Sequence, residues 1–285
     1  MGSTSEKEIA KIRMMVLETD EPDESTRNER GSFAEILHHH FTIAGHNHTP
    51  PLGIETDQRF VVAERGGRVP TFDEFDGVHS ILITGSVFDA HGNNQWILDL
   101  LQLLRELYTR RPDIKFSGIC FGHQLLCRLF GSEVKPQAKG EWELGHSRIS
   151  LTEAGRFLFQ NDASEVYLHQ MHQDHVVAPP SPESSGGLLP PGTRIQVWGS
   201  SEHTQVQGVF IANRIFTTQA HLAFEETMVH RQIQMRVESG SIQDLEHADR
   251  AKETAHLEHD GVKVAAAILR FFHDEDKGVD SMGGS

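Results

Sequence analysis

The chain has 285 residues, 37% hydrophobic and 24% charged, a balance that excludes a disordered, collagen-like or coiled-coil protein. Asp and Glu number 41 against 26 Lys and Arg, and the resulting net charge of −15 disfavours nucleic acid and anionic membranes as partners. No apolar run reaches the roughly 20 residues of a membrane span, and the N-terminus is too polar for a secretory signal. Two cysteines, Cys120 and Cys127, are too few for a disulfide framework. We therefore expect a cytoplasmic protein.

The first half of the chain alternates short apolar segments with amphipathic ones. Ser32 and Glu35 form a capping box that predicts a helix to about Ala44, and leucines at helical spacing predict another over 97–107. The acidic stretch 19–30 is interpreted as a solvated loop. Apolar runs predict strands at 12–17, 58–62, 80–84 and 115–119. Strands that alternate with helices indicate βαβ units and a mostly parallel sheet.

Beyond residue 130 the pattern changes to short strands, which favours a small antiparallel extension of the sheet. These strands are predicted near 146–151, 165–169, 194–198, 204–211 and 214–218. Helices are predicted over 225–236 and 262–272. Neither an internal repeat nor an interdomain linker interrupts the chain. We therefore expect one domain over 1–285, with a core at about 12–236 and a C-terminal helical extension at about 242–275.

Cys120 stands where a predicted strand ends and an apolar helix begins. Gly118 and Gly122 flank it as G-x-C-x-G, the cysteine counterpart of a nucleophile elbow, in which small neighbours permit a sharp turn that exposes the nucleophile. Open α/β sheets bind ligands at this edge, and a helix N-terminus there lowers the pKa of a thiol. The backbone N–H of Phe121 then points to where an oxyanion develops. Cys127, inside the apolar helix, is interpreted as a buried thiol.

The segment Gly118-Ile119-Cys120-Phe121-Gly122-His123-Gln124 resembles the nucleophile motif of the class I glutamine amidotransferases. Further segments resemble motifs of that family, in its order: Ile83-Thr84-Gly85-Ser86, Glu143-Leu144-Gly145, His172-Gln173-Asp174 and Gln219-Ala220-His221. The resemblance covers about 12–236. It is nearest to the free-standing γ-glutamyl peptidases of this superfamily, because no synthetase domain is attached. It implies a flavodoxin-like α/β fold, an open, mostly parallel sheet with helices on both faces.

The resemblance also implies a reaction. In the family, a cysteine attacks a γ-carboxamide to form a thioester, and ammonia or an amine leaves. Carried onto this sequence, Cys120 is the nucleophile and His221 is its general base and acid. The backbone N–H groups of Phe121 and of the Gly85-Ser86 turn hold the oxyanion. The implied substrate-binding residues are Gln124, His172 and Asp174.

The sequence departs from the family just after His221. The family usually reads H-P-E, with the acid two residues after the histidine, whereas Ala223 holds that place here. We favour Glu225 as the carboxylate that orients the imidazole, with Glu226 or Asp174 as alternatives. Two further readings stay open, a cysteine–histidine dyad and a protein that has lost hydrolysis.

Two groups of histidines suggest metal sites, and we favour neither. His169, His172 and His175 would share one stripe on a helix, but their surroundings predict a strand and a turn, which spoils that geometry. The run 38–40 is interpreted as partly exposed helix residues. We expect no metal and no other cofactor. The acidic stretch 19–30 follows the first strand, at the edge that also carries Cys120, where a role in recognising substrate amines stays open.

Three functions compete. The leading one is a cysteine-nucleophile amide hydrolase or transferase that acts on glutamine or a γ-glutamyl conjugate through a thioester. The alternative is a glutaminase subunit that feeds ammonia to a separate synthase, which would dock near the active site. The third is a catalytically silent binding protein of the same fold, against which the retention of Cys120, its glycines and His221 argues. The acyl donor, the acceptor and the oligomeric state stay open.

Overall fold

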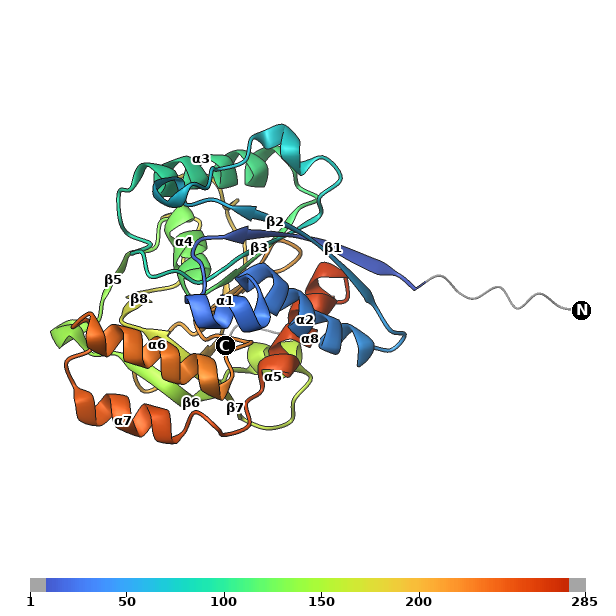
Figure 1. Ribbon diagram of the computed structural model, residues 1–285. Helices are drawn as coiled ribbons and strands as arrows, with labels where there is room; N and C mark the ends of the chain where they lie inside the picture. The colour runs from blue at the N-terminus through green and yellow to red at the C-terminus, as the bar shows by residue number, and fades with distance from the viewer. Residues whose placement is uncertain (1–8, 277–285) are drawn as a thin grey trace, which may run out of the picture.

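The computed structural model describes residues 9–276, and its central feature is a nine-stranded sheet (Figure 1). Five neighbouring strands run parallel, in the order β2 (Gly53–Phe60), β1 (Lys11–Glu18), β3 (Ser80–Ile83), β4 (Lys115–Ile119) and β11 (Ile215–Thr218). All five segments were predicted as strands, although β2 begins at Gly53 and not at 58. The prediction placed β11 in the antiparallel extension, which is wrong, because β11 pairs in parallel with β4. The polar segment 1–8, which bears on the secretory-signal prediction, lies outside the described residues.

Four strands continue the sheet beyond β11 in antiparallel pairing: β10 (Gly208–Ile211), β9 (Gln196–Ser200), β6 (Glu143–Leu151) and β7 (Glu165–His172). A separate two-stranded sheet pairs β5 (Val134–Pro136) with β8 (Asp174–Val176). The predicted antiparallel extension beyond residue 130 is thus confirmed. The extension adds four strands to the five parallel ones, so the nine-stranded sheet is mixed.

Helices cover both faces of the sheet (Figure 1). One face carries α3 (Gln95–Arg110) and α4 (Phe121–Leu129). The other face carries α1 (Glu24–Arg30), α2 (Phe33–His46), α5 (Glu153–Phe159), α6 (Glu226–Glu238), α7 (Leu245–Glu253) and α8 (Gly261–Phe272). Short 3-10 helices occupy connections at Ala63–Arg65, Phe72–Phe75 and Ala138–Gly140. Within the described part of the chain, no helix is long and apolar enough to cross a membrane.

Alternate residues of β1 face opposite sides of the sheet, and each side has its own apolar core. Met14 and Val16 belong to the core beneath α2 and α8, whereas Met15 and Leu17 belong to the core beneath α3 and α4. Because β1, β3 and β4 are largely buried on both faces, they appear in the sequence as short, mainly apolar runs, unlike the edge strand β2. This burial explains why β1, β3 and β4 could be predicted from the sequence.

The acidic stretch 19–30 differs from its interpretation as a loop, since its second half forms α1. Asp23 caps this helix: its side chain accepts a hydrogen bond of 3.0 Å from the backbone N–H of Thr26. Thr26 is the one buried residue of the seven in the helix. A helix this short and this polar has no apolar periodicity to detect.

Candidate active site

Cys120 occupies the turn between β4 and α4, as the sequence predicted. Its backbone has φ 51° and ψ −105°, a conformation that residues other than glycine rarely adopt. The two flanking glycines make the turn possible. A Cβ atom on Gly118 would lie 2.4 Å from the backbone of Gly122, and a Cβ atom on Gly122 would lie 2.4 Å from the carbonyl oxygen of Ile83. Larger residues at either position would therefore push the elbow off the sheet.

His221 follows β11 and reaches the same point. Its backbone N–H donates a 2.9 Å hydrogen bond to the carbonyl oxygen of His169 in β7, which fixes the start of the segment. The imidazole stacks on Phe224, with ring centroids 3.9 Å apart. A Cβ atom on Gly85 would lie 2.9 Å from His221 Cε1 and 3.5 Å from Cys120 Cβ. The imidazole and the cysteine therefore border one glycine, which has room for no side chain.

Burial decides the protonation state of both groups. It raises the pKa of the Cys120 thiol to about 12, although the charge of Arg236 and the N–H of Phe121 act in the opposite direction. It lowers the pKa of His221 to about 3, and the charge of Arg236 adds to that effect. The sequence-based expectation of a lowered thiol pKa is thus wrong for the free protein, because burial outweighs the helix N-terminus. At neutral pH the thiol and the imidazole are both uncharged.

The predicted oxyanion turn is held by two threonine hydroxyl groups. The carbonyl oxygen of Gly85 accepts hydrogen bonds from Thr19 Oγ1 at 3.0 Å and from Thr84 Oγ1 at 3.2 Å. In a trans peptide the N–H points opposite to the C=O, so these bonds also fix the direction of the Ser86 N–H. Within residues 9–276, neither Gly85 nor Ser86 donates its backbone N–H to a protein acceptor. Both donors are therefore free for a ligand.

No carboxylate among the described residues orients His221. Glu225 forms an ion pair with Arg30 of α1, and its side chain is 55% exposed. Glu226 is exposed in the first turn of α6. Asp174 pairs with His91, at 3.0 Å between Oδ2 and Nδ1. The structure therefore does not bring Glu225 or either alternative acid to the imidazole, whose Nε2 is buried without a partner in the described chain.

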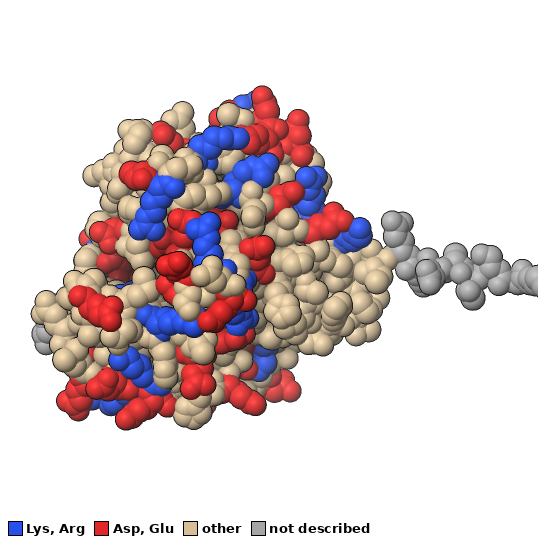
Figure 2. Space-filling view, in the orientation of Figure 1, with Lys and Arg blue, Asp and Glu red and all other residues tan. Residues whose placement is uncertain are grey.

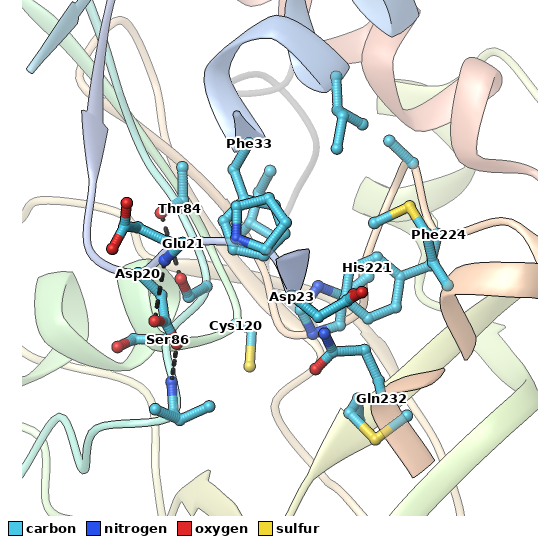
Figure 3. A pocket seen from close by; sticks show the side chains of 18 of the residues that line it. Asp20, Glu21, Asp23, Phe33, Thr84, Ser86, Cys120, His221, Phe224 and Gln232 are labelled. Atoms are coloured by element: carbon cyan, nitrogen blue, oxygen red, sulfur yellow. Dashed lines mark hydrogen bonds between the residues drawn. The ribbon is translucent and has the colours of Figure 1, made fainter. Parts of the chain in front are cut away.

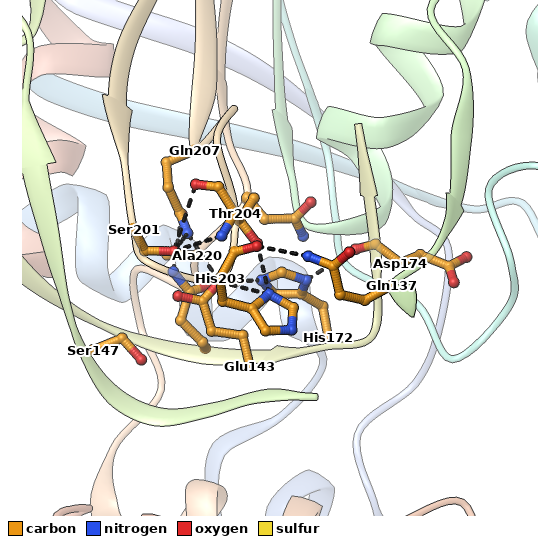
Figure 4. A network of polar contacts seen from close by, with 12 residues as sticks. Gln137, Glu143, Ser147, His172, Asp174, Ser201, His203, Thr204, Gln207 and Ala220 are labelled. Atoms are coloured by element: carbon orange, nitrogen blue, oxygen red, sulfur yellow. Dashed lines mark hydrogen bonds and ion pairs between the residues drawn. The ribbon is translucent and has the colours of Figure 1, made fainter. Parts of the chain in front are cut away.

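The three predicted substrate-binding residues belong to one polar network, of which Figure 4 labels His172 and Asp174. Gln124 Nε2 donates to the carbonyl oxygen of Asp174 at 2.9 Å and to Gln219 Oε1 at 3.1 Å. His172 lies between the Glu143 carboxylate, 3.0 Å from its Nε2, and the same carbonyl oxygen of Asp174. Burial raises the pKa of Glu143, but the hydrogen bond and charge of His172 hold it below its usual value. None of Gln124, His172 and Asp174 lines the cavity described next.

A cavity of about 420 Å³ lies over Cys120 and His221, in the size range of small-molecule sites (Figure 3). Figure 3 shows the Cys120 sulfur between Asp20 and Ser86 on one side and His221 on the other. Most of the wall is apolar and comes from α2, α6 and the segment after His221, including Phe33, Ile36, Leu37, Phe224, Met228 and Met235.

Five charged residues also line the cavity. Asp20, Glu21 and Asp23 come from the acidic stretch 19–30, whose predicted position at the Cys120 edge is confirmed. Arg65 and Arg236 also line the cavity, and no sequence motif pointed to them. On the face that carries α1 and α6, acidic and basic side chains are interspersed (Figure 2). Across the described residues, no group of three or more His, Cys, Asp or Glu could hold a metal ion.

The class-I glutamine amidotransferase family matches residues 71–234. This segment is more than half of the chain and contains both Cys120 and His221. The chain therefore belongs to the class I glutamine amidotransferase family.

Relatives and solved structures agree with this assignment. The Saccharomyces cerevisiae protein YLR126C, whose name describes it as a glutamine amidotransferase, is 31% identical over 202 residues. The match covers 70% of this chain and 72% of the yeast protein. Gamma-glutamyl peptidase 3 of Arabidopsis thaliana is 28% identical over 208 residues, 71% of this chain and 77% of that one. A glutamine amidotransferase crystal structure from Thermotoga maritima has a TM-score of 0.58 at 16% identity, covering 92% of this chain and 98% of the other. This last likeness confirms the flavodoxin-like fold.

Proposed function

We propose that this protein is a cysteine-nucleophile hydrolase or transferase that acts on a γ-glutamyl amide through a thioester. The observation that carries the proposal is the meeting of Cys120, His221 and the Gly85-Ser86 turn in the wall of one cavity. Membership of the class I glutamine amidotransferases and similarity to gamma-glutamyl peptidase 3 support it.

Acylation begins with two neutral groups. The Cys120 sulfur attacks the amide carbon while the imidazole of His221 takes the thiol proton, and the carbonyl π electrons move onto the oxygen. The N–H groups of Phe121 and of Gly85 or Ser86 stabilise that oxyanion. The oxyanion then re-forms the carbonyl, the C–N bond breaks, and His221 gives its proton to the leaving nitrogen. The products are a thioester on Cys120 and free ammonia or amine.

Deacylation reverses the roles. His221 takes a proton from water, or from another acceptor, as its oxygen attacks the thioester carbon. The C–S bond then breaks, the γ-glutamyl product leaves, and the proton returns to the Cys120 sulfur. Because the described residues bring no carboxylate to the imidazole, packing must position it, through the Phe224 ring and the backbone bond to His169. We therefore propose that the pair works as a dyad.

The cavity favours a γ-glutamyl conjugate over free glutamine. Ammonia as a leaving group has no apolar surface, yet apolar side chains of α2 and α6, such as Phe33, Met228 and Met235, form most of the wall. Burying a hydrophobic substituent against such a wall adds about 25 cal/mol per Å² of apolar area. An amide that carries an apolar substituent on its nitrogen therefore suits this site.

The test is turnover with two amides, L-glutamine and L-γ-glutamyl-p-nitroanilide, by the wild type and by Cys120→Ala. We expect the wild type to release p-nitroaniline and Cys120→Ala to release none. A glutamyl adduct on Cys120, seen by mass spectrometry of the quenched enzyme, identifies the thioester. Equal release by the two proteins would refute the mechanism. If the wild type cleaves neither amide, the result would instead favour a glutaminase subunit that needs its synthase, or a binding protein.

A further inference from the structure

Arg236, in the last turn of α6, is a charged group in the cavity without a counterion. Its guanidinium donates from Nη1 to the carbonyl oxygen of Gln232 at 3.1 Å and to Gln232 Oε1 at 2.6 Å. Among the described residues, no carboxylate lies within 4.0 Å of it. Its pKa is lowered, because burial outweighs the opposing influence of Cys120 and Asp20.

The other charged residues that line the cavity are engaged. Asp20 pairs with Arg65 at 2.5 Å and also accepts the backbone N–H of Val87 at 2.8 Å. Glu21 pairs with Arg27 at 2.5 Å. The carboxylate of Asp23 caps α1 and accepts the Thr26 hydroxyl. Asp23 is thus held by hydrogen bonds to Thr26 and not by a cation. Of the two cations that line the cavity in the described part of the chain, Arg65 has a carboxylate partner and Arg236 has none.

A partly buried cation without a counterion is unfavourable, and proteins normally pair such groups. Of the five N–H donors of the guanidinium, Gln232 engages those of Nη1 alone, which leaves the donors of Nε and Nη2 for a ligand. Gln232 is itself 7% exposed, so it holds the guanidinium firmly in place. Trp142 flanks the group, with its ring centroid 5.7 Å from the guanidinium carbon. A planar fork fixed in this way matches a carboxylate, which it binds through two parallel hydrogen bonds.

We infer that Arg236 binds a carboxylate of the substrate beside Cys120, and that the substrate is therefore an anionic amide. In a γ-glutamyl amide this group is the α-carboxylate, while the amide nitrogen and its substituent extend toward the apolar wall of α2. The inference rests on the proposed function, because it assigns one end of the same substrate. It distinguishes γ-glutamyl amides from neutral amides, which offer Arg236 no counterion.

A second role for Arg236 makes a different prediction. If its charge served only to stabilise the Cys120 thiolate, its removal would slow the chemistry of every substrate and leave binding unchanged. If it binds the α-carboxylate, its removal weakens binding of the acid and spares a ligand that lacks the acid. Binding measurements without turnover therefore separate the two roles.

The experiment measures binding to Cys120→Ala by isothermal titration calorimetry with two ligands, L-γ-glutamyl-p-nitroanilide and its α-carboxamide. We expect the acid to bind at least tenfold more tightly than the carboxamide, as hydrogen bonds between charged groups require. In Cys120→Ala, the additional substitution Arg236→Gln should abolish that preference, because it weakens binding of the acid and leaves binding of the carboxamide unchanged. Arg236→Lys should keep part of it, since it keeps the charge and loses the fork. The control is Arg231→Gln, the same change on the same helix at a residue that pairs with Glu29, which should bind as the parent does.

Three results would overturn the inference: equal binding of acid and carboxamide by Cys120→Ala, equal weakening of both ligands by Arg236→Gln, or no binding of the acid at all. Thermal unfolding of each variant shows whether it is folded. Failure of the proposed function looks different, since the acid would then bind through Arg236 while the wild type cleaved no γ-glutamyl amide. Cleavage without a preference for the acid would leave the function standing and remove only the role of Arg236.

Discussion

Cys120 holds its side chain over the cavity at a conformational cost. A non-glycine residue at φ 51° and ψ −105° is strained by about 1–3 kcal/mol. Comparing Cys120→Gly with Cys120→Ala isolates this strain, because neither variant has the thiol and glycine alone tolerates the conformation. We expect the glycine variant to have a free energy of unfolding about 1 kcal/mol higher, measured by urea denaturation. A less stable glycine variant would show that the turn is unstrained.

His221 and Glu225 are four residues apart, yet the structure separates their roles. His221→Asn removes the proposed general base and should lower kcat by at least 100-fold. Glu225→Gln breaks the surface ion pair with Arg30 and should leave kcat within twofold of the wild type. Steady-state cleavage of a γ-glutamyl anilide checks both variants. A large loss of kcat in Glu225→Gln would mean that this carboxylate reaches the imidazole during turnover.

The ends of β1 and β3 act together as a support for the oxyanion turn. Thr19 Oγ1 donates toward the carbonyl oxygens of Thr84 and Gly85, both at 3.0 Å. Thr19→Val keeps the shape of the side chain and removes these bonds. The Gly85 carbonyl oxygen then keeps only its bond from the Thr84 hydroxyl, so the Gly85-Ser86 peptide is held less firmly. We expect kcat to fall about tenfold with little change in KM, since the lost interaction serves the transition state. A rise in KM at constant kcat would instead assign Thr19 to substrate binding.

Sequence periodicity predicted some elements better than others, for physical reasons. The Ser32–Glu35 capping box is present as predicted, and α2 begins at the next residue. β1, β3 and β4 were recognised because they are buried on both faces. By contrast, α1 was missed, and α5 and α7 were not predicted as separate helices. Each is nine residues or shorter, with few buried side chains, so no periodic apolar pattern marks it.

At the scale of the whole molecule, buried neutral histidines make the fold sensitive to acid. Burial lowers the pKa of His123, His169 and His221 to about 3 in the folded protein, against an ordinary value of 6.5. Between these values the unfolded chain binds more protons than the folded one, so stability falls as the pH drops below 6.5. Each histidine should contribute a loss of about 1.4 kcal/mol at pH 5.5 relative to neutral pH.

Urea denaturation at pH 7.5 and pH 5.5 tests this sensitivity. We expect a lower midpoint at pH 5.5 and a smaller difference for His123→Asn, whose amide can still bond to Thr217 in place of the imidazole. Identical midpoints at the two pH values would show that these imidazoles are protonated in the folded protein.

Some features of the candidate site could be predicted from the sequence, and others depend on the whole folded molecule. The positions of Cys120, His221 and the Gly85 turn could be predicted because strand-end motifs fix them locally. Their catalytic roles stay predictions. The protonation states of Cys120 and His221 were not predicted, because the burial of these side chains depends on elements from the whole chain. Arg236 carried no signal, since a lone arginine on an amphipathic helix resembles any surface residue. The organisation as one domain over 1–285 stays a prediction.

The cavity joins two sets of residues with separate origins in the fold. The proposed reacting groups sit at the ends of β3, β4 and β11, whereas residues 20–23, α2, α6 and the segment after His221 supply most of the remaining wall. Residues such as Phe33 and Met228 can therefore change without disturbing the elbow. Related chains could therefore keep the same reacting groups and accept different conjugates. A combinatorial library confined to wall residues of these helices would vary substrate specificity without changing the reacting groups.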